Sequence, residues 1–227
     1  MARTRATTYD AQRQLILETA AGAFAELGFP SASMNDIAAR CGVSKGLLYH
    51  YYTSKEQLLF DLTEQYTRRL VAIAEDAERR LAEPAARLEK LIRGFLDEYQ
   101  TSQSRHMVLL HDLRFLPERE RAIVVGNERR VIEVFAAAIR AAYDLPRQLP
   151  ASRAATMMLF GMLNWTFTWL KPPGAGTAAG RAGRMTYADY AEMVVKVFGT
   201  GLAALVRDRE IANGTKQRRA RRTSPVA

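Results

Sequence analysis

The sequence has little of what several classes of protein need: one cysteine, three histidines and no long hydrophobic run. A single cysteine excludes an intramolecular disulfide and fits a reducing cytosol. No apolar stretch follows the first arginines, as it would in a signal peptide, and the longest apolar run, residues 157–170, is too short to span a membrane. Hydrophobic residues still make up 48% of the 227, enough for a substantial core. We therefore expect a cytoplasmic protein with no membrane partner.

Residues that carry enzymatic or metal chemistry do not converge anywhere in the chain. His106 and His111 lie five positions apart, so on a helix their side chains would diverge by about 140° and share no face. The glycines of the segment GAGTAAG have the wrong spacing for a dinucleotide-binding fingerprint, and no strand pattern precedes them. We expect no catalytic residue, no metal site and no cofactor.

The charge balance favours an anionic partner. The net charge is +9, and about half of it comes from five basic residues near the carboxy terminus: Lys216, Arg218, Arg219, Arg221 and Arg222. Charge alone does not choose between nucleic acid and a membrane surface.

Residues 33–52 have the pattern of a helix-turn-helix. Ser33 with Asp36 three positions later resembles a capping box, which predicts that a helix begins there. Gly42 supplies the backbone freedom of a tight turn, and Ser44 can cap a second, short helix. In DNA-binding proteins this second helix enters the major groove.

Two segments carry a family resemblance. LILETAAGAFAELGF (residues 15–29) followed by SMNDIAARCGVSKGLLYHYYTSKEQLL (33–59) resembles the amino-terminal domain of the TetR family of bacterial transcriptional regulators. The resemblance covers about the first 60 to 70 residues. The other two-thirds of the chain resembles the family only in being helical and of the right length.

The resemblance implies which residues bind double-stranded DNA. Those expected to hold phosphates are Ser33, Ser44, Lys45, Tyr49, His50 and Lys55. Gly46 and Leu47 lie where the family approaches base edges, since glycine permits close approach and leucine offers an apolar contact to a thymine methyl group. A helix-turn-helix used only for packing is the alternative.

Apolar residues recur at helical spacing along the whole chain, and no strand pattern appears. We predict an all-α fold of about nine helices, with a three-helix DNA-binding domain followed by a helical bundle. The expected parts are a flexible basic arm (1–9), the DNA-binding domain (10–70), an effector-binding and dimerisation domain (71–209) and a disordered basic tail (210–227). The tail would either add salt-dependent DNA affinity or have no function.

The helix predicted over 151–170 is unusually rich in methionine and aromatic residues. A place in the core is the ordinary explanation. The stretch is also similar to the NW-x-x-x-W segment, followed by a basic residue and proline, of TetR-type regulators that sense acyl-coenzyme A thioesters. For the expected effector pocket, the candidate ligand-binding residues are Phe95, Tyr99, Met107, Leu110, His111, Met158, Asn164, Trp165 and Trp169.

Basic residues near helix ends offer two interpretations. They would meet coenzyme A phosphates or lie solvated on the surface: Arg105, Arg114, Lys171, Arg181 and Arg184.

The sequence thus predicts a homodimeric repressor that binds a palindromic operator and is released by a small-molecule effector. The resemblance implies dimerisation through the helices predicted over 151–170 and 186–209. The alternatives are a nucleoid-associated or cell-organisation protein with a protein partner, a transcriptional activator, and, third in rank, an enzyme.

Overall fold

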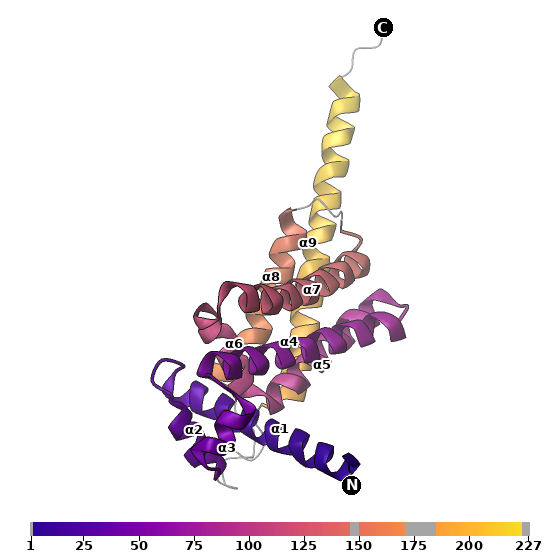
Figure 1. The fold of residues 1–227 in the computed structure, drawn as a ribbon. Coiled ribbons are helices and arrows are strands. Elements are labelled where there is room, and N and C mark those ends of the chain that lie inside the picture. The colour runs from indigo at the N-terminus through magenta and orange to yellow at the C-terminus, as the bar shows by residue number, and fades with distance from the viewer. Residues whose placement is uncertain (1, 146–149, 171–184, 224–227) are drawn as a thin grey trace. The chain divides into compact units, whose positions relative to one another are not determined.

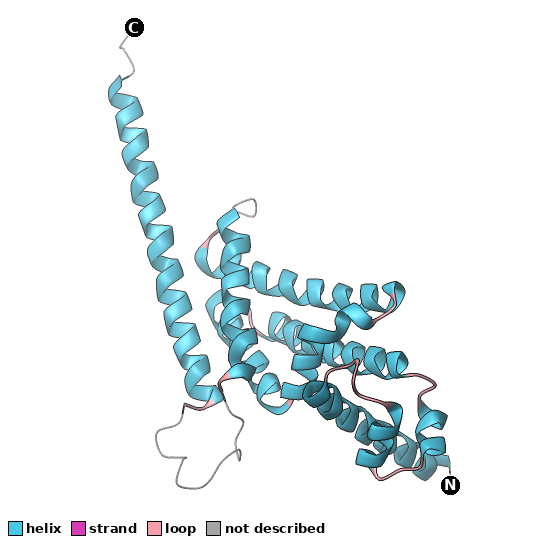
Figure 2. Ribbon diagram, turned by 90° about the vertical axis from the view of Figure 1, so that its left-hand side faces the viewer, coloured by secondary structure: helices cyan, strands magenta, loops and turns pink. Residues whose placement is uncertain are grey.

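The computed structural model describes the backbone of residues 2–145, 150–170 and 185–223, and within these ranges the side chains of 9–145, 152–170 and 185–207. This part of the chain consists of helices joined by turns and contains no strand, so the predicted all-α fold is confirmed (Figure 2). None of its helices is both long and apolar enough to cross a membrane.

Nine α-helices and two short 3-10 helices follow one another along the described ranges. They are α1 (Ala2–Leu27), α2 (Met34–Cys41), α3 (Lys45–Tyr51), α4 (Lys55–Arg80), α5 (Pro84–Thr101), α6 (Gln103–Asp112), η1 (Leu113–Phe115), α7 (Glu118–Tyr143), α8 (Pro150–Asn164), η2 (Trp165–Thr168) and α9 (Tyr187–Thr223) (Figure 1). The chain forms two compact units: unit 1 is Met1–Glu75 with Glu98–Val131, and unit 2 is Asp76–Asp97 with Ile132–Ala227. The predicted domain boundary after residue 70 stays a prediction.

Two helices are longer than the sequence suggested. α1 begins at Ala2, so residues 2–9 are helical where a flexible arm was expected. α9 continues to Thr223, so residues 210–223 are helical where disorder was expected. Neither segment has the apolar spacing from which the other helices were predicted. Alanine, arginine, lysine and glutamine are nevertheless good helix formers, and neither segment contains a proline.

The core of unit 1 joins the helix-turn-helix to the helices around it. α1 buries Ile16, Leu17 and Phe24, and packs against both α2 and α6. Ile37 of α2 and Leu48 of α3 are fully buried in the same unit. Each such side chain contributes about 1.5–3 kcal/mol when it leaves water. Burial of these residues therefore fixes which face of α3 points outward.

The core of unit 2 places α8 beside α9 (Figures 1 and 2). The Tyr190 hydroxyl of α9 donates a 2.9 Å hydrogen bond to the Met162 carbonyl of α8. Phe135 of α7 lies between Phe95 and Phe160, with ring centroids 4.8 and 4.9 Å away. Large apolar side chains of α8 and α9, such as Met158 and Val197, are exposed in the described part of unit 2.

Candidate nucleic-acid interface

The start of α2 has the predicted capping box. The Ser33 hydroxyl accepts a 3.1 Å hydrogen bond from the Asp36 N–H, and the Asp36 carboxylate accepts a 3.0 Å hydrogen bond from the Ser33 N–H. The Ser33 hydroxyl also bonds the carboxylate, and together these bonds lower the pKa of Asp36. The charged form of Asp36 therefore helps to cap the start of α2.

The turn between α2 and α3 needs its glycine. Gly42 has φ 68° and ψ 27°, in the left-handed region that costs other residues energy. The Gly42 and Val43 N–H groups donate to the Ala39 and Ala38 carbonyls, each at 3.1 Å, which satisfies the end of α2. The Ser44 hydroxyl then accepts a 3.1 Å hydrogen bond from the Leu47 N–H and caps α3 as predicted.

α3 presents most of the residues expected to bind DNA. Leu48 is its buried residue, and the exposed ones are Lys45, Gly46, Leu47, Tyr49 and His50. The Leu47 side chain is 40% exposed, which leaves an apolar group available for a base edge. The Lys45 ammonium lies 5.8 Å from the Tyr49 ring centroid, within the range of a cation–π contact.

Aromatic stacking also holds α3 against α1. The Tyr9 ring of α1 stacks on the Tyr51 ring of α3 with centroids 4.6 Å apart, and His50 meets Tyr51 edge-on at 5.7 Å. Residues 9 and 51 are far apart in the sequence, so neither their spacing nor their composition indicates this contact.

Lys55 has a different setting from the other predicted DNA contacts. Its Nζ donates to the carbonyls of Phe29 at 2.7 Å, Ala32 at 2.9 Å and Pro30 at 3.2 Å, and it lies 4.4 Å from the Phe29 ring centroid. An ammonium has three protons to donate, so these carbonyls use all of them. Lys55 closes the turn between α1 and α2. Its role as a phosphate contact stays a prediction, one that requires the ammonium to leave the turn.

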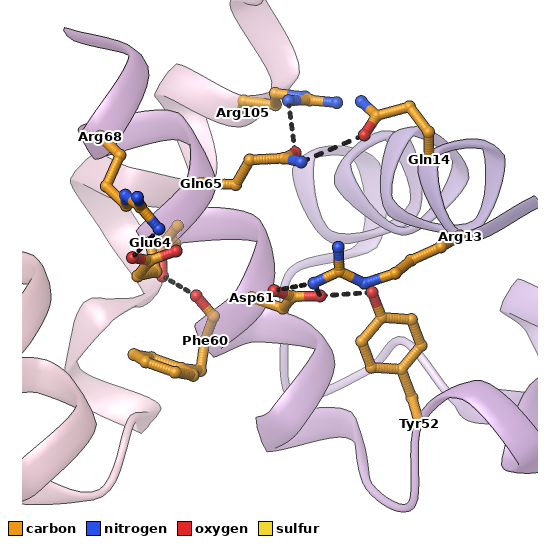
Figure 3. A network of polar contacts seen from close by, with 10 residues as sticks. Arg13, Gln14, Tyr52, Phe60, Asp61, Glu64, Gln65, Arg68 and Arg105 are labelled. Carbon is orange, nitrogen blue, oxygen red and sulfur yellow. Dashed lines mark hydrogen bonds and ion pairs between the residues drawn. The ribbon is translucent and has the colours of Figure 1, made fainter. Parts of the chain in front are cut away.

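A polar cluster that the sequence did not reveal fixes α1 and the end of α3 to α4 (Figure 3). Arg13 Nη2 lies 2.7 Å from both carboxylate oxygens of Asp61, and the Tyr52 hydroxyl donates to the same carboxylate. Burial raises the pKa of Tyr52, and the hydrogen bond to Asp61 acts in the same direction, so the hydroxyl keeps its proton. Tyr52 directly follows α3, and the cluster therefore holds the end of that helix.

The cluster continues to α6 through two amides (Figure 3). Gln65 of α4 donates to Gln14 of α1 at 3.2 Å and accepts from Arg105 of α6 at 3.2 Å. Arg105 also pairs with Glu18 at 3.7 Å, and its side chain is only 16% exposed. Arg105 thus connects helices of unit 1 rather than lying solvated on the surface.

The residues predicted to bind a ligand do not all lie in one unit. In unit 1, Leu110 and His111 line an open cavity, while Tyr99 stacks on the buried His106 ring at 4.0 Å. Met107 and Asn164 are partly buried in units 1 and 2 respectively.

The remaining four belong to unit 2. Phe95 is fully buried in its core, whereas Met158, Trp165 and Trp169 are 59%, 62% and 47% exposed. The expected α-helix over 151–170 changes to a 3-10 helix at Trp165, where the hydroxyls of Thr166 and Thr168 bond local carbonyls. Lys171, Arg181 and Arg184 lie outside the described residues.

Comparison with known families agrees with this geometry. Residues 16–62 match the model for bacterial regulatory proteins of the tetR family, and residues 81–202 match a tetracycline-repressor-like carboxy-terminal domain. A crystal structure of a TetR-family regulator from Bordetella parapertussis is 33% identical, with a TM-score of 0.73 over 82% of this chain and 93% of that one.

Two further relatives carry more specific names. The crystal structure of AibR in complex with isovaleryl coenzyme A and operator DNA is 25% identical, with a TM-score of 0.68 over 82% of this chain and 97% of that one. The transcriptional activator FasR of Mycolicibacterium smegmatis is 28% identical over 127 residues, which are 56% of this chain and 58% of FasR. The match to FasR thus spans less than two thirds of that protein.

The carboxy-terminal model alone matches more than half of the chain, and the amino-terminal model covers the capped α2–α3 pair. The family consists of DNA-binding regulators rather than enzymes, as the sequence predicted. The chain belongs to the TetR family of bacterial transcriptional regulators.

Proposed function

We propose that this DNA-binding regulator acts as a homodimeric repressor that binds a palindromic operator and leaves it when a small-molecule effector binds. The observation that carries the proposal is α3 itself. It is capped at its start, fixed by buried Leu48 and by the Tyr52–Asp61 contact, and turns Lys45 and Leu47 outward. One seven-residue helix contacts few bases, so two copies reading two half-sites supply the specificity.

The exposed side of α8, η2 and α9 supports the homodimer. Large apolar side chains more than two-fifths exposed gather there: Met157, Met158, Trp165, Trp169, Met193, Val197 and Leu205. Gly161 and Gly201 have no atoms close to where a Cβ would lie, so a second helix can approach closely. A cluster of exposed apolar side chains is typical of a protein–protein interface. Pairing of α8 and α9 from two copies would cover it, including the two tryptophans that the sequence assigned to a ligand site.

An acyl-coenzyme A thioester is the effector class that we propose. The support is the NW-x-x-x-W segment and the likeness to AibR, whose crystal structure holds isovaleryl coenzyme A. An effector that binds one arrangement of the protein more tightly shifts the population toward it. If that arrangement separates the two α3 helices differently, binding to both half-sites weakens.

Activation rather than repression is the second candidate. The observation that favours it is the likeness to FasR, which is named an activator. A reporter gene behind the operator distinguishes the two: deletion of the regulator raises expression if it represses and lowers expression if it activates.

The experiment that tests the proposal is fluorescence anisotropy on DNA from upstream of the regulator's own gene, with random competitor DNA. Acyl-coenzyme A thioesters are titrated in, with coenzyme A and the free acids as controls. We expect tight binding that one thioester releases. Specific binding that no thioester disturbs would remove the effector class but keep the regulator. Binding no tighter than to competitor would favour the nucleoid-associated alternative.

A further inference from the structure

Unit 1 contains a cavity of about 460 Å³. Its wall is linked by side-chain contacts to the segment that leads into the helix-turn-helix. Residues of α6, η1 and α7 line the cavity: Leu109, Leu110, His111, Leu113, Arg114 and Glu128. This volume lies within the range of about 300–1,000 Å³ that is typical of small-molecule sites.

The lining combines apolar walls with a small number of polar groups. Three leucines supply the walls, and the guanidinium of Arg114 offers a planar, permanently charged fork of donors suited to carboxylate or phosphate. Glu128 is the carboxyl group of the lining, and burial raises its pKa. Burial thus disfavours the charged form of Glu128, which reduces its repulsion of an anion. The lining therefore suits a molecule with an anionic group and an aliphatic part.

The cavity wall is in direct contact with the turn that leads into α2. Arg114 lies over the Phe115 ring at 4.9 Å, and Phe115 stacks on Phe29 with centroids 5.1 Å apart and ring planes 22° from parallel. Phe29 is 4% exposed and its carbonyl accepts from Lys55. Asp112, buried at the end of α6, accepts a hydrogen bond from the Phe29 N–H. Residues 112–115 thus include both residues that line the cavity and two residues that contact Phe29.

We propose that this cavity binds an organic anion that carries an alkyl chain, and that the bound anion is sensed at Phe29 through Arg114 and Phe115. Arg114 pairs with the anion, and the leucines cover the chain. Pairing draws the guanidinium away from the Phe115 ring, which changes the Phe115–Phe29 stack and with it the turn before α2. The regulatory half of this inference rests on the proposed function. A free carboxylic acid and the phosphates of an acyl-coenzyme A share the required chemistry.

Isothermal titration calorimetry of the full-length protein without DNA tests the binding half, with octanoate and octanoyl-coenzyme A as separate probes. We expect one probe to bind the wild type. Arg114→Gln should weaken its binding at least about tenfold, because glutamine lacks the charge that pairs with the anion. Leu110→Trp should weaken it similarly by filling the cavity. Both positions are exposed, so the variants should fold. Arg153→Gln, at an exposed position of α8, is the matched control and should bind like the wild type.

Two outcomes would contradict the binding site. The first is that neither probe binds the wild type. The second is that both Arg114→Gln and Leu110→Trp bind the probe with the wild-type affinity. Because this titration contains no DNA, failure of the proposed repressor function does not alter its result.

Phe115→Leu tests the regulatory half, since leucine keeps the apolar volume but cannot stack on Phe29. We expect the variant to bind the probe within about twofold of wild type. Its operator affinity, measured by anisotropy, should no longer respond to the probe. A variant that responds as strongly as wild type would overturn the role of Phe115.

Discussion

Single side chains determine where α2 and α3 begin, before any contact with DNA is made. Ser33, Asp36 and Ser44 satisfy backbone N–H groups that helix starts leave unpaired, and Gly42 takes a backbone conformation that other residues avoid. All of them lie within 12 consecutive positions. The sequence predicted these helix caps because every contact that makes them is local.

Ser33→Ala should destabilise the protein by about 1 kcal/mol, since alanine cannot accept the hydrogen bond from the Asp36 N–H. Urea unfolding measures the change. Ser31→Ala is the matched control, at an exposed position outside the capping box, and should lie within about 0.5 kcal/mol of wild type. Equal effects of the two substitutions would contradict the role of the box.

The contribution of Asp36 should depend on pH. Hydrogen bonds from Ser33 lower its pKa in the folded state, so the charged form is favoured on folding. The stabilisation is therefore present above the unfolded-state pKa of about 4 and disappears as the pH falls through the lower folded-state value. The difference in urea midpoint between wild type and Asp36→Ala should be constant from pH 7 to 5 and shrink below pH 4. A difference that grows on acidification would contradict this sign.

Lys55 shows where residue-level prediction fails. The sequence places it at the start of α4, but its three carbonyl partners lie 23 to 26 positions earlier. We expect Lys55→Ala to lower stability by about 1–3 kcal/mol, because it leaves part-buried carbonyls unpaired. Urea unfolding measures this, with Lys196→Ala, an exposed residue of α9, as control. If Lys55→Ala left stability unchanged but weakened DNA binding, the structural role would be contradicted and Lys55 would be a phosphate contact.

At the scale of elements, the position of α3 depends on its contacts with α1 and α4. The residues that the resemblance assigned to DNA on this helix are exposed, and Leu48 is buried. The sequence did not predict the Arg13–Asp61 pair, 48 positions apart, or the Gln14–Gln65–Arg105 chain. Polar pairs between helices depend on how the helices pack, and the spacing of residues in the sequence does not show which helices pack together.

Lys45→Ala should weaken DNA binding about equally on all sequences and leave stability unchanged. If Lys45 contacts a phosphate, the slope of log affinity against log salt concentration should fall by about one per protomer. Anisotropy at several salt concentrations measures the slope, and Lys196→Ala should keep the wild-type value. A loss that is confined to one DNA sequence would instead assign Lys45 to a base edge.

At the scale of the whole molecule, the sequence predicted an all-helical regulator but did not distinguish core from interface on α8. Methionine and tryptophan at helical spacing suit either environment. Trp165 and Val197 are 62% and 57% exposed, and the proposed dimer would cover both. α9 also continues to Thr223, beyond the end expected near residue 209.

Trp165→Glu and Val197→Glu should each convert the dimer to monomers, because they would bury a carboxylate in the proposed interface. Light scattering after size exclusion measures the mass, and circular dichroism should show an unchanged helix content. Ala122→Glu, at an exposed position of α7, should remain dimeric. Variants that keep the wild-type mass would exclude this side of α8 and α9 as the interface.

Footprinting on DNA upstream of the regulator's gene tests the central claim most directly, with wild type and Val197→Glu compared at equal concentration. The account predicts protection of two inverted half-sites whose centres lie about 34–36 Å apart, or a multiple of that, on one face of the duplex. Val197→Glu should lose protection of both half-sites together. Protection of a single half-site by wild type, or an unchanged footprint with the variant, would contradict a dimer that reads DNA through α3.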